Sequence, residues 1–280
     1  MNKYFSKLIE NLALLFVLIL SNQAFAQNSI ISTPEQIEES VKSAPCDSEK
    51  RLEAVQQLFE KLGAKKDDIV IEKFDKDRIS NLVVRKKGKT DETIIVGGHY
   101  DKTPDGCGVI DNWTGISIVA HLYRTIAQIE TQKSYIFVAF DKEEKGLLGS
   151  EEMAKAIPKE KRSSYCSMVN LDSFGLGAPQ ALRNASDPAL ISIAKKLAKE
   201  AKIPFADASI GNADSDSSSF NKRGIPAISI HGLSNNWQNY LHTSSDQIKN
   251  VNMSSVYFGY RFGLSYIAEL DAKPCSDNKK

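Results

Sequence analysis

The 280-residue sequence has no excess of charge of either sign, with 36 basic and 35 acidic residues and a formal net charge of +1. This balance argues against a surface that binds nucleic acid or anionic membranes by charge alone. The sequence also has no internal repeat, no low-complexity segment and no evident linker. We therefore expect one folded domain.

The Gly-x-Ser-x-Gly motif of serine hydrolases is also absent. Although serines are abundant, neither "GISIV" nor "GLLGSEE" puts one on a strand-to-helix elbow, which disfavours a serine nucleophile. A cysteine nucleophile would require Cys107 or Cys166 to be free, which export to an oxidising compartment disfavours.

The N-terminal segment has the pattern of a secretory signal. A basic start is followed by an apolar run at 12–20 and by Ala24-Phe25-Ala26. The run is shorter than the roughly 20 residues of a membrane-spanning helix, so removal of residues 1–26 is favoured over a membrane anchor. We expect a domain at 27–280, exported to the periplasm or the medium. No cysteine directly follows the cleavage point to carry a lipid anchor.

Four cysteines in an exported chain predict disulfides, and three pairings are open. Cys46 and Cys275 lie near the two ends of the mature chain, and chain ends are often close in space. We therefore expect Cys46 to pair with Cys275 and Cys107 with Cys166.

Apolar periodicity predicts alternating strands and helices. The predicted strands are 69–74, 80–85, 93–98, 134–141, 167–173 and 225–232. The predicted helices are 34–62, broken near Pro45, and 114–128, 150–156, 187–203, 217–222 and 252–270. This alternation is typical of a three-layer α/β/α domain around a mixed, largely parallel sheet.

Acidic and imidazole side chains follow the predicted strands. They are His99, Asp101, Asp111, Glu143, Glu144, Asp172 and His242. Each alone is weak evidence, because an acidic residue after a strand is commonly a helix cap. Since ligands bind beyond the carboxyl ends of parallel strands, we expect these side chains to converge.

Two histidines and several carboxylates, with no thiolate nearby, suit Zn²⁺ in a catalytic role. A cluster this acidic would repel itself without cations. Two zinc ions bridged by one carboxylate would neutralise it and generate a hydroxide nucleophile.

Six segments in chain order resemble the secreted bacterial aminopeptidases with two co-catalytic zinc ions. This branch belongs to a zinc peptidase clan that includes glutaminyl cyclases and glutamate carboxypeptidases. The segments are "GGHYD", "GVIDNWTG", "FDKEEKGLLGS", "NLDS", "ADSDSSSFNKRGIPAISI" and "LHTSSDQI".

The resemblance implies a set of metal ligands. His99 and Asp172 would hold one zinc ion, Glu144 and His242 the other, and Asp111 would bridge them.

It also implies that Glu143 is the general base, which takes a proton from the zinc-bound water and passes it to the leaving amine. Asp101 would orient the His99 ring. The peptide bond between Asp111 and Asn112 would be cis.

The sequence departs from the family pattern in three places. Ile110 stands where the family often has a polar residue, and Leu241 stands where some members have an oxyanion-stabilising tyrosine, with Tyr240 one residue earlier. Asp214 and Asp216 lie in a segment that differs from the usual "SDH", so a structural role or a substrate contact is open for both.

The expected function is removal of N-terminal residues from peptides by attack of zinc-bound hydroxide. Alternatives on the same scaffold are a glutaminyl cyclase with one zinc ion, a carboxypeptidase or a dipeptidase. A non-catalytic binding relative is disfavoured because every ligand position is chemically competent. We expect a peptide substrate, no nucleic-acid partner and a monomer.

Overall fold

The computed structural model describes residues 29–74, 78–211 and 213–276. The predicted signal peptide, residues 1–26, lies outside them. The chain divides after Thr33, and all described helices and strands lie in the unit that begins at Pro34.

One eight-stranded sheet forms the centre of this unit, in the order β1-β2-β4-β3-β5-β8-β6-β7. Its strands are β1 (Ile69–Phe74), β2 (Ile79–Lys86), β3 (Thr93–His99), β4 (Ser134–Phe140), β5 (Tyr165–Leu171), β6 (Gln180–Leu182), β7 (Ala206–Ala208) and β8 (Ala227–His231). The central strands β4, β3, β5 and β8 run parallel, whereas β2 and β6 pair antiparallel with them. The carboxyl ends of the four central strands therefore meet at one edge of the sheet.

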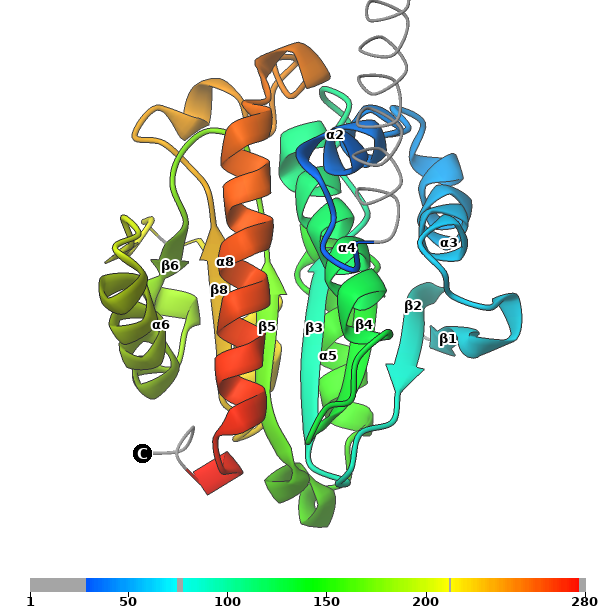
Figure 1. The fold of residues 1–280 in the computed structure, drawn as a ribbon. Helices are drawn as coiled ribbons and strands as arrows, with labels where there is room; N and C mark the ends of the chain where they lie inside the picture. Colours follow the sequence, from blue (N-terminus) through cyan, green and yellow to red (C-terminus); the bar gives the residue numbers. More distant parts are fainter. Residues whose placement is uncertain (1–28, 75–77, 212, 277–280) are drawn as a thin grey trace, which may run out of the picture. The chain divides into compact units, whose positions relative to one another are not determined.

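Helices cover both faces of the sheet, as Figure 1 shows for α4 and α8 in front of it and α5 behind it. The helices are α2 (Pro34–Lys42), α3 (Arg51–Lys61), α4 (Thr114–Ile126), α5 (Leu148–Ala156), α6 (Pro188–Ala201), α7 (Ser217–Asn221) and α8 (Met253–Ala272). Ile94 and Val96 of β3 pack into a core with α4 and α8, while Ile95 packs into a second core with α5 and α7. Successive side chains of one strand thus pack on opposite faces of the sheet. The sheet and the helices on its two faces form three layers.

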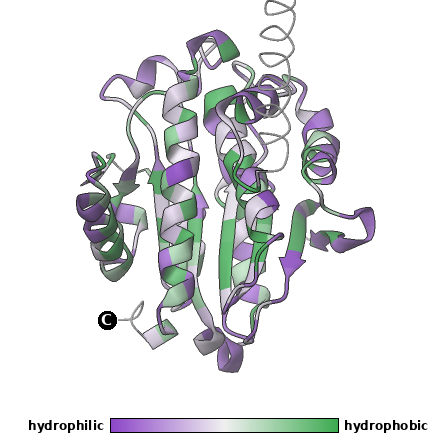
Figure 2. Cartoon of the chain, in the orientation of Figure 1, coloured by the Kyte–Doolittle hydropathy of each residue, from purple (hydrophilic) through white to green (hydrophobic). Residues whose placement is uncertain are grey.

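The central strands are largely apolar because both of their faces are covered. All seven residues of β3 are buried, and Figure 2 shows the same hydrophobic character along the central strands. The polar residues that follow each strand therefore lie where the chain leaves the core. The side chains that could bind a ligand or catalyse a reaction therefore lie at this edge of the sheet.

The structure confirms the predicted fold class and most element boundaries to within two residues. The helical stretch is interrupted around Pro45 as predicted, since α2 ends at Lys42 and α3 begins at Arg51. The short strands β6 and β7 were not predicted, because three residues carry too little alternation to be recognised. Among the described residues, no helix is long and apolar enough to span a membrane.

The predicted disulfide pairing is wrong. Cys46 bonds to Cys107, and Cys166 bonds to Cys275. Cys107 follows the carboxyl end of β3, whereas Cys166 lies at the start of its parallel neighbour β5. A strand of this length spans about 20 Å, far more than the few ångström between bonded cysteines. The two inner cysteines therefore lie at opposite edges of the sheet and cannot pair.

Candidate functional site

The structure brings the predicted ligand residues and Glu143 together around one cavity of about 330 Å³ at the carboxyl edge of the sheet. His99 ends β3, Asp111 precedes α4, Asp172 follows β5, and His242 lies in the segment between β8 and α8. Glu143 and Glu144 form a turn after β4. Elements far apart in the sequence thus each contribute one or two side chains.

Asp111 lies between the two histidines. Its Oδ1 is 3.1 Å from His99 Nε2, and its Oδ2 is 3.0 Å from His242 Nε2. On one side, His99 Nε2 is 3.6 Å from Asp172 Oδ1; on the other, His242 Nε2 is 3.2 Å from Glu144 Oε2. One carboxylate therefore links two pairs that each contain an imidazole and a carboxylate.

Electrostatics favour positive charge beside both rings. Burial alone would lower the pKa of His99, but the field of Glu143 and the contacts with Asp101 and Asp111 raise that pKa well above its ordinary value. Contacts with Asp111 and Glu144 raise the pKa of His242 to about 10. A metal cation bound at the Nε2 atoms would supply this positive charge in place of the protons.

The donor set fits such a cation. Donor atoms of His99, Asp111 and Glu144 lie within 4.8 Å of one another, as do donor atoms of His99, Glu143 and Asp172. Within the described part of the chain, Glu144 Oε1 is buried and has no hydrogen-bond partner. Imidazole nitrogens and carboxylate oxygens suit zinc and related divalent ions.

Asp101 connects the His99 ring to the glutamate turn. Its carboxylate accepts hydrogen bonds from the main-chain N–H groups of Glu143 and Glu144, at 3.0 and 3.2 Å. Its Oδ1 is also 3.3 Å from His99 Nδ1. One side chain thus fixes both the ring orientation and the position of the two glutamates.

The two glutamates have different surroundings. Burial raises the pKa of Glu143 well above its ordinary value, and the nearby carboxylates of Asp216 and Asp172 raise it further against the field of His99. Burial also raises the pKa of Glu144, but contact with His242 opposes that shift. Glu144 is therefore already paired with an imidazole.

The segment that carries Asp111 is held by the side chains of Asp246, which the sequence analysis did not single out, and Asn112. Asp246 is buried and accepts hydrogen bonds from the N–H groups of Ile110 and Asp111, at 2.7 and 3.1 Å. The predicted cis peptide bond between Asp111 and Asn112 is confirmed. The Asn112 amide donates to the Leu171 carbonyl at the end of β5, at 2.9 Å.

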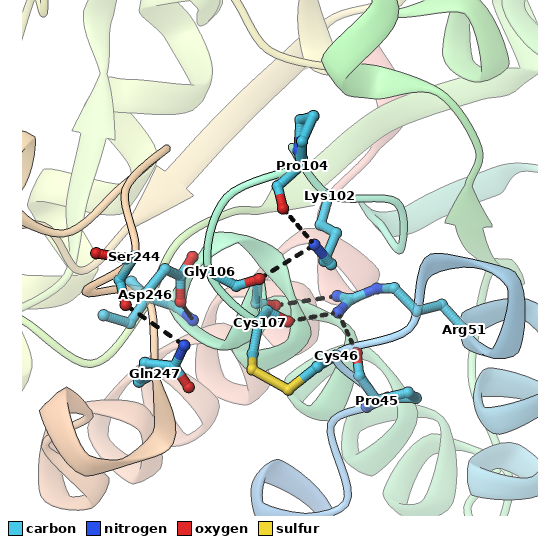
Figure 3. Close-up of a disulfide and its surroundings, with 12 residues drawn as sticks. Pro45, Cys46, Arg51, Lys102, Pro104, Gly106, Cys107, Ser244, Asp246 and Gln247 are labelled. Carbon is cyan, nitrogen blue, oxygen red and sulfur yellow. Dashed lines mark hydrogen bonds between the residues drawn. A yellow bond between two sulfur atoms is a disulfide. The ribbon is translucent and has the colours of Figure 1, made fainter.

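Arg51 lies beneath the acidic cluster and is fully buried. Its guanidinium donates to the carbonyls of Pro45, Cys107 and Gly108, each at 3.0 Å, and to the Tyr100 carbonyl. Figure 3 shows the bonds from Arg51 to Pro45 and Cys107 beside the Cys46–Cys107 disulfide. Burial lowers the pKa of Arg51 to about 10, so it remains cationic at neutral pH.

Asp172 is held by two hydroxyl groups. Ser215 Oγ donates to Asp172 Oδ2 at 2.6 Å, and Ser173 Oγ donates to Oδ1 at 3.0 Å. Ser215 belongs to the segment "ADSDSSSF", where sequence reasoning considered the aspartates instead. Of these, Asp214 pairs with the exposed Lys222, whereas Asp216 is fully buried.

The oxyanion candidate Tyr240 is not among the described residues that line the cavity. It packs against a small apolar cluster of Ile110, Leu233 and Leu241, and Leu241 lines the cavity instead. Tyr240 therefore remains only a sequence-based candidate.

The sequence is similar to that of a known protein. A probable leucine aminopeptidase of Arthroderma otae is 29% identical over 245 residues, which cover 80% of this chain and 65% of that protein. The chain thus covers slightly less than two thirds of this relative's length.

Solved structures share the fold. The Legionella pneumophila LapA aminopeptidase has a TM-score of 0.72 at 20% identity, covering 86% of this chain and 72% of that one. The Fimbriiglobus ruber glutaminyl cyclase has a TM-score of 0.69 at 18% identity, covering 85% and 95%. Residues 81–257 match the family model described as Peptidase family M28. Because this segment is more than half of the chain, the protein belongs to peptidase family M28.

Proposed function

We propose that this protein is a zinc aminopeptidase that removes N-terminal residues from peptides. The observation that carries the proposal is the position of Asp111 between two imidazole–carboxylate pairs, with Glu143 beside them in the same cavity. The names of the related leucine aminopeptidases support it.

The proposed centre would bind two zinc ions. His99 and Asp172 would hold one, Glu144 and His242 would hold the other, and Asp111 would be shared between them. The contacts from His99 and His242 to the two oxygens of Asp111 support this assignment. When bound, zinc polarises the scissile carbonyl and lowers the pKa of water.

Glu143 is the proposed general base. Its carboxylate takes the proton of the attacking water and then donates it to the nitrogen of the leaving amine. Burial favours the protonated form of this carboxyl group, and bound cations favour the ionised form, so metal loading prepares Glu143 to accept a proton. Asp101 positions Glu143 through its main-chain N–H.

The charge of the cavity supports an aminopeptidase over a carboxypeptidase. Five carboxylates line it: Asp111, Glu143, Glu144, Asp172 and Asp214. Among the residues that the structure describes, none of those lining the cavity is lysine or arginine. With Asp111, Glu144 and Asp172 assigned to zinc, Glu143 and Asp214 are the carboxylates left to complement a substrate α-ammonium group. A substrate α-carboxylate would find no lysine or arginine partner among these lining residues.

A glutaminyl cyclase with one zinc ion is the second candidate. The similarity of the fold to the Fimbriiglobus ruber glutaminyl cyclase, which covers 95% of that chain, favours it. Metal count and product distinguish the two. Two zinc ions and a released amino acid indicate a peptidase, whereas one zinc ion and pyroglutamate indicate a cyclase.

The test is a chelator-sensitive assay of residues 27–280 on a panel of aminoacyl chromogenic substrates, followed by zinc add-back. We expect activity to disappear with chelator and to return as zinc approaches two equivalents per chain. Activity on none of these substrates, or activity that survives complete zinc removal, would overturn the proposal.

We further propose that the protein is exported after cleavage at Ala26 and acts as a monomer. Two disulfides support an oxidising compartment. N-terminal sequencing of the protein from the periplasm or medium should begin at Gln27. A protein that retains residues 1–26 would contradict this.

A further inference from the structure

The cavity extends beyond the acidic and imidazole cluster into an apolar region. This part is lined by Leu182, Ile210, Leu233, Trp237 and Leu241. If the proposed function holds, the first carbonyl of the substrate lies at the cluster. The side chain of the N-terminal residue then faces this region, which makes it a side-chain pocket.

One polar ring interrupts the apolar lining. His231 ends β8, is 5% exposed and lines the cavity. Its Nδ1 accepts a hydrogen bond from the Leu233 N–H at 3.2 Å. An imidazole nitrogen that accepts carries no proton, so in the neutral ring the proton is on Nε2.

His231 Nε2 is a buried donor without a partner. Across the described ranges of the chain, no group accepts its hydrogen bond. An unsatisfied buried donor costs about 1–3 kcal/mol, so an acceptor that enters with the substrate would gain more here than at a hydrated site. Burial lowers the pKa of His231 to about 4, so the ring is neutral at physiological pH.

His231 also lines a second cavity that has few ionisable groups. This cavity of about 700 Å³ adjoins the first, and both are lined by His231, Leu233 and Trp237. Its other polar lining includes Gln180, Asn235 and Gln238. Among its described lining residues none is aspartate, glutamate, lysine or arginine, and His242, the proposed metal ligand, is its one ionisable group besides His231. A cationic substrate side chain would lose its hydration there without gaining an opposite charge, and the only cationic group open to an anionic one, His242, is assigned to the metal.

From the unpartnered Nε2–H of His231 in this mainly apolar pocket, we propose that the enzyme prefers N-terminal residues with a neutral hydrogen-bond acceptor in the side chain, namely glutamine and asparagine. His231 donates to the side-chain carbonyl oxygen. The apolar walls contact its methylene groups. This inference rests on the proposed function for the orientation of the substrate.

The test compares zinc-loaded wild type with His231→Phe and His231→Gln on glutaminyl and leucyl substrates. Phenylalanine keeps an aromatic ring and removes the Nε2 donor. It also removes the acceptor of the Leu233 N–H, which should affect both substrates alike. The ratio of kcat/KM for glutamine over leucine should therefore fall about tenfold. Glutamine at position 231 carries an N–H donor at a similar reach and should restore much of that ratio. Thermal unfolding of each variant checks that the fold is retained.

A ratio that stays within about twofold of wild type in His231→Phe would overturn the proposal. So would an equal loss on both substrates, which would indicate a structural role or a contact with the substrate main chain. Calorimetric binding of free glutamine and free leucine gives the same comparison without turnover.

The two proposals can fail separately. Glutamine binding that depends on residue 231, in a protein that hydrolyses no substrate, would refute the aminopeptidase and retain the pocket. Hydrolysis of both substrates with a ratio independent of residue 231 would do the reverse.

Discussion

The Asp246 carboxylate holds the main chain at Asp111 by two hydrogen bonds. One oxygen accepts the Asp111 N–H at 3.1 Å, and the other accepts the N–H of the preceding residue, Ile110, at 2.7 Å. Asp111 is the proposed bridge between the two metal ions. The buried Asp246 therefore controls the position of the bridge without facing the metal.

Replacing Asp246 with asparagine should weaken zinc binding and destabilise the fold. One oxygen becomes an NH₂ group that faces an N–H donor, so we expect a loss of about 2 kcal/mol in the free energy of unfolding. Urea denaturation and zinc analysis measure the two effects. Asp105→Asn, at an exposed position, is the control. Equal stability and zinc content in both variants would refute this role.

Arg51→Met should be more damaging, because it leaves four main-chain carbonyls near the site without their donor. We expect at least about 3 kcal/mol of destabilisation, with Arg51→Lys intermediate because lysine keeps the charge but lacks the planar fork. Chemical denaturation of the zinc-loaded proteins measures this. The exposed Arg261→Met is the matched control, and a similarly small effect at both positions would contradict the prediction.

Peptide mapping without reduction should recover Cys46 joined to Cys107 and Cys166 joined to Cys275. Replacing either pair with serine should cost about 2–4 kcal/mol, because each bond closes a long loop. Only the loss of the first pair should also reduce zinc affinity, since that bond lies beside Arg51 and the segment before Asp111. Equal zinc affinity in both double variants would refute that distinction.

The metal-free protein should lose stability as the pH rises from 6 to 9. Burial raises the pKa of Asp216 from 3.8 to about 7, and contacts with Asp111 and Glu144 raise the pKa of His242 from 6.5 to about 10. A group with a raised pKa in the folded state contributes stability below its unfolded pKa and loses it as the pH passes the folded pKa. Both groups therefore act in the same direction, Asp216 up to about pH 7 and His242 from about pH 6.5 upward.

The zinc-loaded protein should behave differently, because metal replaces the proton on His242 and binds more tightly as the pH rises. Thermal unfolding should show Tm falling by about 5 °C or more in the metal-free protein and by less in the loaded one. A parallel fall in both forms would show that these groups do not control the dependence.

The sequence predicted most of the sheet and the converging side chains because both follow from local signals. The central strands are largely apolar runs, and because they are parallel, the residue after each run leaves the core at the same edge. His99 and Asp172 could be placed in this way without knowing any contact.

The residues that sequence reasoning missed act through partners that are distant in sequence. Asp246 and Arg51 bind main-chain groups, which carry no residue type to recognise. His231 reads as the last residue of an apolar strand, and only the structure reveals its unpartnered nitrogen. The pairing of Cys107 depends on which edge of the sheet it reaches, which chain-end proximity does not decide.

The central proposal is that adjacent glutamates have unlike roles, with Glu143 as the base and Glu144 as a ligand. The most direct measurement is the zinc content and turnover of purified Glu143→Gln, alongside Glu144→Gln. Glu143→Gln should keep two zinc ions and a wild-type Tm while losing at least about 10³-fold in kcat, because the proton has no acceptor. Glu144→Gln should lose zinc. A zinc-replete Glu143→Gln that turns over at the wild-type rate would contradict the proposal.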